Sequence, residues 1–218
     1  MHSLIMKIFK KVLVILPVVL VGILYFRVLY HESYSGTSFK RVVGFVLSMA
    51  LLYSWILFFT IRRKQESFLQ VIIHSSFFVY VFAVLQLTCY FILFKEISAH
   101  DWWDKMNHRI ETHDHVNLTP FKTMNIYNMF DKQVAGNFVM LLPLGIYLPL
   151  LYRKFRKGSG FFAVLLISFF VSVGIELLQL ATSYRSADVD DVILNTLGAC
   201  VGFFIYLLFK LLVGGSRK

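Results

Sequence analysis

Long apolar runs alternate with short polar segments along nearly the whole chain. Six such runs stand out, at residues 12–30, 42–61, 68–94, about 134–151, 161–182 and 192–213. All but the fourth reach the ~20 residues that a helix needs to cross ~30 Å of hydrocarbon at 1.5 Å per residue. The pattern predicts an all-α fold, a polytopic transmembrane helical bundle with about six spans, in which residues 1–218 form a single membrane domain.

The fourth run is the shortest. Its apolar part, FVMLLPLGIYLPLL from Phe138 to Leu151, holds 14 residues, and an ideal helix of that length covers only ~21 Å. Pro143, Gly145 and Pro149 interrupt it. Prolines are tolerated in membrane helices where other groups satisfy the freed carbonyls. We therefore expect a short, kinked span, with a re-entrant segment as the alternative.

Composition and charge agree with a membrane protein and indicate its orientation. The chain is 58% hydrophobic and only 16% charged, with a net charge of +10, which excludes a purely soluble class. Basic clusters at 7–11, 62–64, 153–157 and 210–218 abut the ends of runs. By the positive-inside rule, both termini and these clusters are cytoplasmic. The positive charge thus reflects orientation, and we expect no nucleic-acid partner.

The long segment 95–135 then lies on the outer side. Within AHDWWDKMNHRIET, apolar residues recur at three- and four-residue steps, at Trp103, Met106 and Ile110. This spacing predicts an amphipathic helix in the outer headgroup region, where tryptophan is favoured. NLTPF predicts the start of a second helix, with Thr119 as N-cap and Pro120 at the first helical position.

A polar stripe runs along the fifth apolar run. Ser172, Glu176, Gln179 and Ser183 follow one another at steps of four, three and four residues, which places them on one helical face. A glutamate in hydrocarbon costs a few kcal/mol unless it is protonated, paired or hydrated. We therefore expect Glu176 to have a polar partner.

The sixth run begins with RSADVDDVILNTLGACVG and repeats this geometry. Either Asp190 or Asp191 is predicted to cap its N-terminus. One face carries Asp191, Asn195, Gly198 and Gly202. The two glycines form a small-xxx-small pair that lets another helix approach closely. With Asn137 at the outer entry of the fourth run, several polar groups are expected to converge near the outer surface.

Four motifs carry a resemblance to a known family. VNLTPFKT, GNFVMLLPLGIYLP, IELLQL and RSADVDDVILNTLGA, in this order and spacing over about residues 116–202, resemble the VanZ-like family of small bacterial membrane proteins. The family is named for a protein associated with low-level resistance to the glycopeptide teicoplanin, so the resemblance implies a bacterial cytoplasmic membrane and a role in glycopeptide resistance. The positions that match its motifs are Asn117, Pro120, Phe121, Asn137, Pro143, Gly145, Glu176, Gln179, Arg185, Asp188, Asp190, Asp191, Asn195 and Gly198.

Two hypotheses account for these polar residues without catalysis. In the first, Arg185 pairs with Asp188 or Glu176, and the asparagines bridge helices, all to fix one bundle. In the second, which we favour, they form a recess for a polar head group: Arg185 holds phosphate or carboxylate, and amides contact sugar or peptide groups. The predicted ligand-binding residues are Asn117, Phe121, Asn137, Glu176, Gln179, Arg185, Asp188, Asp190, Asp191 and Asn195. By analogy with the family, the ligand is a lipid-linked peptidoglycan precursor or a lipoglycopeptide.

Catalysis and transport are the remaining alternatives. The clustered carboxylates are ligands of the kind that Mg²⁺ or Ca²⁺ prefers, so a metal-assisted transfer on a lipid phosphate is conceivable. We find no nucleophile motif, however, and expect neither turnover nor a cofactor. His113 and His115 have a spacing usable for a metal, but a solvated loop is the preferred interpretation. No internal repeat suggests a transporter.

Overall fold

A computed structural model describes residues 12, 15, 19, 22–23, 46–47, 49–50, 53–54, 68–88, 102–112, 116–126, 131–182 and 185–214. By its internal contacts the chain forms two compact units, residues 1–98 and 99–218.

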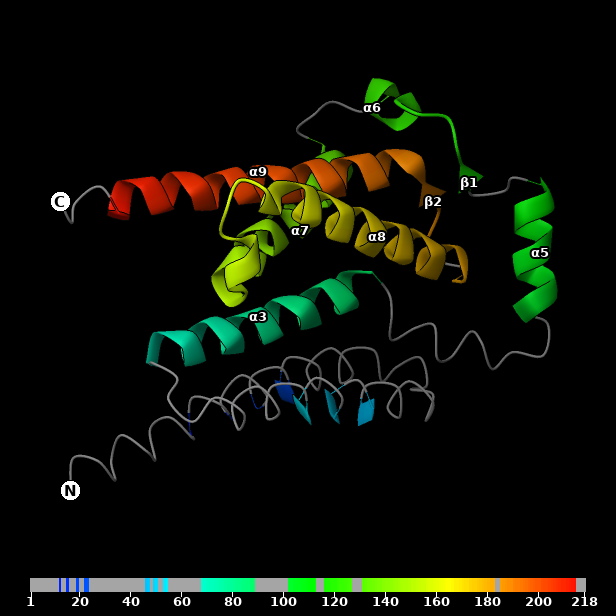
Figure 1. Ribbon diagram of the computed structural model, residues 1–218. Helices are drawn as coiled ribbons and strands as arrows, with labels where there is room; N and C mark the ends of the chain where they lie inside the picture. The colour runs from blue at the N-terminus through cyan, green and yellow to red at the C-terminus, as the bar shows by residue number, and fades with distance from the viewer. Residues whose placement is uncertain are drawn as a thin grey trace. The chain divides into compact units, whose positions relative to one another are not determined.

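In the first unit, helix α3 spans Phe68–Leu87, the first part of the third predicted span (Figure 1). Its Ile72–Leu87 portion is apolar. The residues described from the first and second apolar runs are helical. Otherwise these two predicted spans lie outside the described residues, so the count of six spans stays a prediction.

The second unit contains three helices that are long and apolar enough to cross a membrane. These are α7 (Lys132–Leu151), α8 (Gly160–Leu180) and α9 (Val189–Gly214). Helix α7 is longer than predicted: it has 20 residues, which corresponds to ~30 Å. Its first turns are polar and therefore fall outside the apolar pattern, and both prolines lie within the continuous helix. The short span expected from the sequence was wrong in length, and the expected kink stays a prediction.

Helices α7 and α9 pack together in parallel through glycines. A Cβ at Gly198 would overlap the carbonyl of Phe138, and a Cβ at Gly202 would overlap the carbonyl of Leu142. From the other side, a Cβ at Gly145 would meet the backbone of α9. The close approach expected of the small-xxx-small pair is confirmed, and α7 is the partner helix. Helix α8 runs alongside α9 (Figure 1) in the opposite direction.

Basic residues gather at one end of this three-helix bundle. The turn η2 (Arg153–Phe155) follows α7, and the guanidinium of Arg156 donates to the carbonyls of Pro149 and Leu150 at 3.0 Å each. Lys210 in turn donates to the carbonyl of Arg156 at 3.0 Å. Positive side chains here satisfy carbonyls at the negative end of α7.

The other end carries short connecting elements: α5 (Trp102–Thr112), β1 (Val116–Asn117), α6 (Lys122–Ile126) and β2 (Ala187–Asp188). The two-residue strands pair in parallel, with Asn117 opposite Asp188, an addition to the predicted all-α fold. The predicted start of the second loop helix was wrong by two residues. Thr119 and Pro120 instead lie before the first residue of α6. Thr119 does not cap α6, because N–H groups of its first turn donate to the side chain of Asp190.

Candidate functional site

Asp188 ties the start of α9 to the loop segment that precedes α6. Its Oδ1 accepts from the backbone N–H of Asp190 at 2.9 Å, which is the geometry of an N-cap. The same atom accepts from Asn117 Nδ2 at 2.9 Å, and Oδ2 accepts from the Thr123 hydroxyl. The predicted cap, Asp190 or Asp191, was therefore wrong: the cap is Asp188, which immediately precedes the first residue of α9, Val189.

Asp190 caps a different helix. Its carboxylate accepts the backbone N–H groups of Phe121 at 2.5 Å, Thr123 at 2.7 Å and Met124 at 3.2 Å, which open α6. Asp190 is completely buried. A carboxylate of α9 thus fixes the conformation of a short segment more than sixty residues earlier in the chain.

Phe121 is strained by this arrangement. It has a φ of 65°, in the left-handed region that a bulky residue rarely adopts. The residue is 56% exposed. Strained residues persist where the surroundings hold them, and they cluster at functional sites. Here the hydrogen bond to Asp190 holds the backbone, and the ring stands at the polar end of the bundle.

The polar stripe of α8 faces the bundle, as predicted. Ser172, Glu176 and Gln179 are all buried, whereas Ser183 lies outside the described residues. Glu176 has the expected partner, since its Oε2 accepts from the backbone N–H of Asp188 at 2.9 Å. Ser172 accepts from Asn195 Nδ2 at 2.9 Å. The stripe therefore joins α8 to both the start and the second turn of α9.

Asp191 and Asn195 lie on the buried face of α9. The Asn137 side chain of α7 hydrogen-bonds the Asp191 carboxylate. One oxygen of each α9 residue, Oδ1 of Asp191 and Oδ1 of Asn195, is buried without a hydrogen-bond partner. Three helices thus meet at this pair.

Arg185 supplies a positive charge at the exposed rim. Its side chain is exposed, and its charge interacts with the carboxylates of Glu176 and Asp191. The same two carboxylates experience the negative charge of Asp188. The buried part of the polar end is consequently acidic, and the guanidinium of Arg185 lies at its exposed rim.

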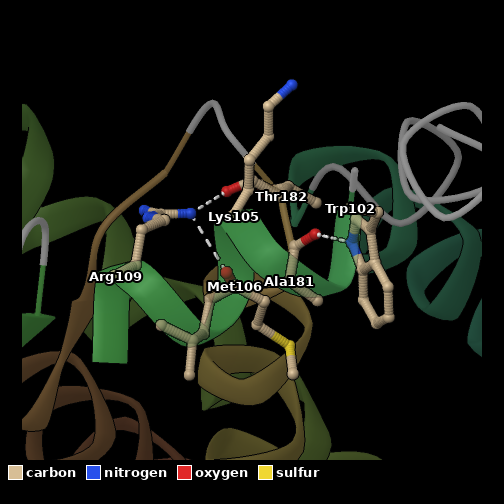
Figure 2. A pocket seen from close by; sticks show the side chains of 7 residues that line it. Trp102, Lys105, Met106, Arg109, Ala181 and Thr182 are labelled. Atoms are coloured by element: carbon tan, nitrogen blue, oxygen red, sulfur yellow. Dashed lines mark hydrogen bonds between the residues drawn. The ribbon is translucent and has the colours of Figure 1, made fainter. Parts of the chain in front are cut away.

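The contact of α5 with the end of α8 was not predicted. Trp102 Nε1 donates to the carbonyl of Ala181 at 2.8 Å. The Arg109 guanidinium donates to the carbonyls of Leu180 at 3.0 Å, Thr182, and Arg185 at 2.6 Å. Figure 2 shows Trp102, Arg109, Ala181 and Thr182 around a small pocket between the two helices. Arg109 satisfies carbonyls at the negative end of α8.

Most of the predicted site residues come together at this end. Hydrogen bonds join Asn117, Glu176, Asp188 and Asp190 in one network. Phe121 joins this network through its backbone. Two separate bonds join Asn137 to Asp191 and Asn195 to Ser172. Gln179 is buried, and its carbonyl accepts from Thr182 at the end of α8. Thr123, which the sequence did not single out, bridges Asn117 and Asp188.

The metal-assisted alternative requires clustered ligands in the described part of the chain. No three or more His, Cys, Asp or Glu side chains there are arranged to hold a metal ion. His113 and His115 lie outside the described residues.

One comparison with known proteins gave a match. The family model described as VanZ/LLP1 matches residues 77–210, which is more than half of the chain. The match begins within α3, well before the motifs that carry the resemblance. Neither the curated proteins nor the solved structures gave a match.

Proposed function

The chain belongs to the VanZ/LLP1 family, and we propose that it is a bacterial cytoplasmic-membrane protein that binds the polar head of a lipid-tailed cell-envelope molecule. The head group would be that of a lipid-linked peptidoglycan precursor or of a lipoglycopeptide. By holding such a molecule without turning it over, the protein would contribute to glycopeptide resistance. The ligand classes come from the family resemblance, and the structure bears on where and how the ligand would be held.

The separation of charge along the bundle supports an outward-facing site. The basic side chains of Arg156 and Lys210 lie at the end opposite to Glu176, Asp188 and Asp190. Short basic segments beside membrane helices favour the cytoplasm. The polar end then faces outward, where cell-envelope precursors are displayed and glycopeptides arrive.

The observation that carries the proposal is the exposed ring of Phe121 on a strained backbone. Packing of the side chain gives no reason to hold a phenylalanine at a φ of 65° where the residue is 56% exposed. A flat aromatic face suits the apolar face of a sugar or a lipid tail. Arg185, at the same end and exposed, suits a phosphate or carboxylate.

The buried residues would then serve as the frame of this site. Asp190 holds the backbone of Phe121, and Asp188 holds Asn117. The acidic interior disfavours an anion at depth, so a phosphate would stay at the rim beside Arg185. Hydroxyl or amide groups of the head would approach Asn117 and Asn137, which are only partly buried.

A purely structural role is the competing explanation, because much of the network is internally satisfied. The two hypotheses differ at the rim. Phe121 and Arg185 have exposed side chains, so truncating them disturbs little packing. If the network only fixes the bundle, Phe121→Ala leaves stability nearly unchanged, and Arg185→Ala changes stability equally with and without a ligand.

The test is a thermal-shift titration of the purified full-length protein with each candidate ligand. A ligand that binds only the folded state raises its stability by mass action. We expect a saturable rise in Tm that Phe121→Ala and Arg185→Ala each weaken by about tenfold in apparent Kd, or ~1.4 kcal/mol. The matched controls are Phe162→Ala and Arg153→Ala, whose exposed side chains lie towards the basic end.

The controls should titrate like the unsubstituted protein. A rise in Tm that all four variants share would place binding elsewhere on the protein. No rise with either ligand, in protein shown to be folded, would refute the proposed function.

A further inference from the structure

Two unpartnered oxygens mark a second feature of the polar end. Oδ1 of Asp191 and Oδ1 of Asn195 have no hydrogen-bond partner, although the two residues are only 7% and 0% exposed. Buried polar groups are nearly always satisfied, and each exception needs an explanation. Both of these atoms are acceptors, so what they lack is a donor or a cation.

The two unpartnered oxygens belong to neighbouring residues on one face of α9. Four residues separate them on α9, which puts them on the same face, one turn apart. The Asp191 carboxylate is hydrogen-bonded by Asn137 of α7. The amide nitrogen of Asn195 donates to Ser172 of α8 at 2.9 Å. The oxygens left over therefore lie where α7, α8 and α9 meet.

Negative charge is concentrated around these two oxygens. Glu176, Asp188 and Asp190 add three carboxylates to that of Asp191. The donors that reach Asp188 and Asp190 are backbone N–H groups and the neutral side chains of Asn117 and Thr123. These bonds leave the negative charge in place.

Positive charge nearby is smaller. Arg185 interacts with Glu176 and Asp191 from the exposed rim, and Arg109 binds carbonyls at the end of α8. The carboxylates of Asp188, Asp190 and Asp191 thus outnumber the guanidinium of Arg185, whose charge acts on Asp191. A water molecule would satisfy the two free oxygens but would leave this imbalance, whereas a cation would resolve both.

We propose that Asp191 and Asn195 bind a monovalent metal cation, sodium or potassium, between α7, α8 and α9. One carboxylate oxygen, one amide oxygen and the nearby hydroxyl of Ser172 form a ligand set of hard oxygens with a single negative charge. Hard cations take carboxylate and amide oxygens of this kind as ligands. A divalent cation fits less well, since no three acidic, histidine or cysteine side chains in the described ranges are arranged to hold one.

Such a cation would fasten the three helices beneath the proposed rim site. Its binding does not depend on the proposed function, because the rim residues Phe121 and Arg185 are not among its ligands. The cation site should therefore form with no lipid-tailed ligand present.

The test is the Tm of the purified full-length protein, without any lipid-tailed ligand, in NaCl, KCl or N-methylglucamine chloride at equal ionic strength. We expect a saturable rise of roughly 2–4 °C in at least one of the two metal salts over the organic cation. Asp191→Asn keeps the size of the side chain but removes its charge, and should abolish the rise. Asp104→Asn is the matched control, because it removes one negative charge from an exposed position on α5. This variant should retain the rise in Tm.

A second variant keeps the test decisive if Asp191→Asn does not fold. Asn195→Asp adds a negative charge one helical turn from Asp191. It should lower about tenfold the salt concentration that gives half of the maximal rise in Tm. Equal Tm values in all three salts would overturn the proposal, because a water or a proton would then suffice. A rise that Asp191→Asn retains, or a half-maximal concentration that Asn195→Asp leaves unchanged, would overturn it as well.

Discussion

Replacing Gly198 by alanine tests whether the contact between α7 and α9 holds the polar site together. The added methyl group would overlap the backbone carbonyl of Phe138 on α7. A backbone atom cannot turn aside as a flexible side chain does, so the helices must separate locally. Asn137, the neighbour of Phe138, would then move away from Asp191, whose carboxylate it hydrogen-bonds.

The structure offers a matched control for the size of this effect. Overpacking a well-packed contact by one methyl group costs about 1–3 kcal/mol. A Cβ at Gly174 of α8 has no other atom within 4 Å, and alanine there stabilises a helix by about 0.5–1 kcal/mol. The free energies of unfolding of Gly198→Ala and Gly174→Ala should therefore differ by about 1.5–4 kcal/mol.

Denaturant unfolding of both variants in the same detergent, followed by circular dichroism, measures this difference. Gly198→Ala should also weaken ligand binding at the rim, whereas Gly174→Ala should not. If Gly198→Ala proves as stable as Gly174→Ala, the glycine contact does not hold the two helices and the account of the bundle is wrong.

Three further predictions concern the connecting segments. Asp190→Ala should lower the free energy of unfolding by about 1–3 kcal/mol and expose α6 to protease. The control is Asp131→Ala, which should change the free energy of unfolding by no more than ~0.5 kcal/mol, because the Asp131 side chain makes no cap hydrogen bond. Equal proteolysis of the two variants would contradict the capping role of Asp190. Arg109→Ala should speed hydrogen exchange along α5 by about tenfold, because α5 loses its bonds to the end of α8; unchanged exchange would refute that contact. In a cysteine-free background, a cysteine at Ser186 should react with impermeant reagents on whole cells and one at Gly158 should not, and the reverse pattern would invert the proposed orientation.

Local periodicity predicted the faces of the helices well. Ser172, Glu176 and Gln179 lie on one buried face because a helix repeats every 3.6 residues whatever surrounds it. The same rule placed Asp191 and Asn195 on the buried face of α9. The pair Gly198 and Gly202 predicted a close helix contact, although only the structure identifies α7 as the partner.

Features that depend on distant partners were beyond the sequence. Asp188 and Asp190 are equally good caps by local rules, and their roles are decided by the pairing of β1 with β2, which brings α6 to Asp190. Arg109 resembled any charged residue on an exposed helix face, since nothing local indicates that carbonyls of α8 lie opposite it. The length of α7 was underestimated because its first turns are polar but still helical.

The most direct test of the central claim is to locate the bound ligand. A lipid-linked peptidoglycan precursor with a photoreactive group on its head would be cross-linked to the full-length protein in membranes, and the labelled peptides identified by mass spectrometry. The account predicts labelling within 116–126 and 185–195, reduced in Phe121→Ala. Labelling confined to the basic end, at 153–157, would contradict it.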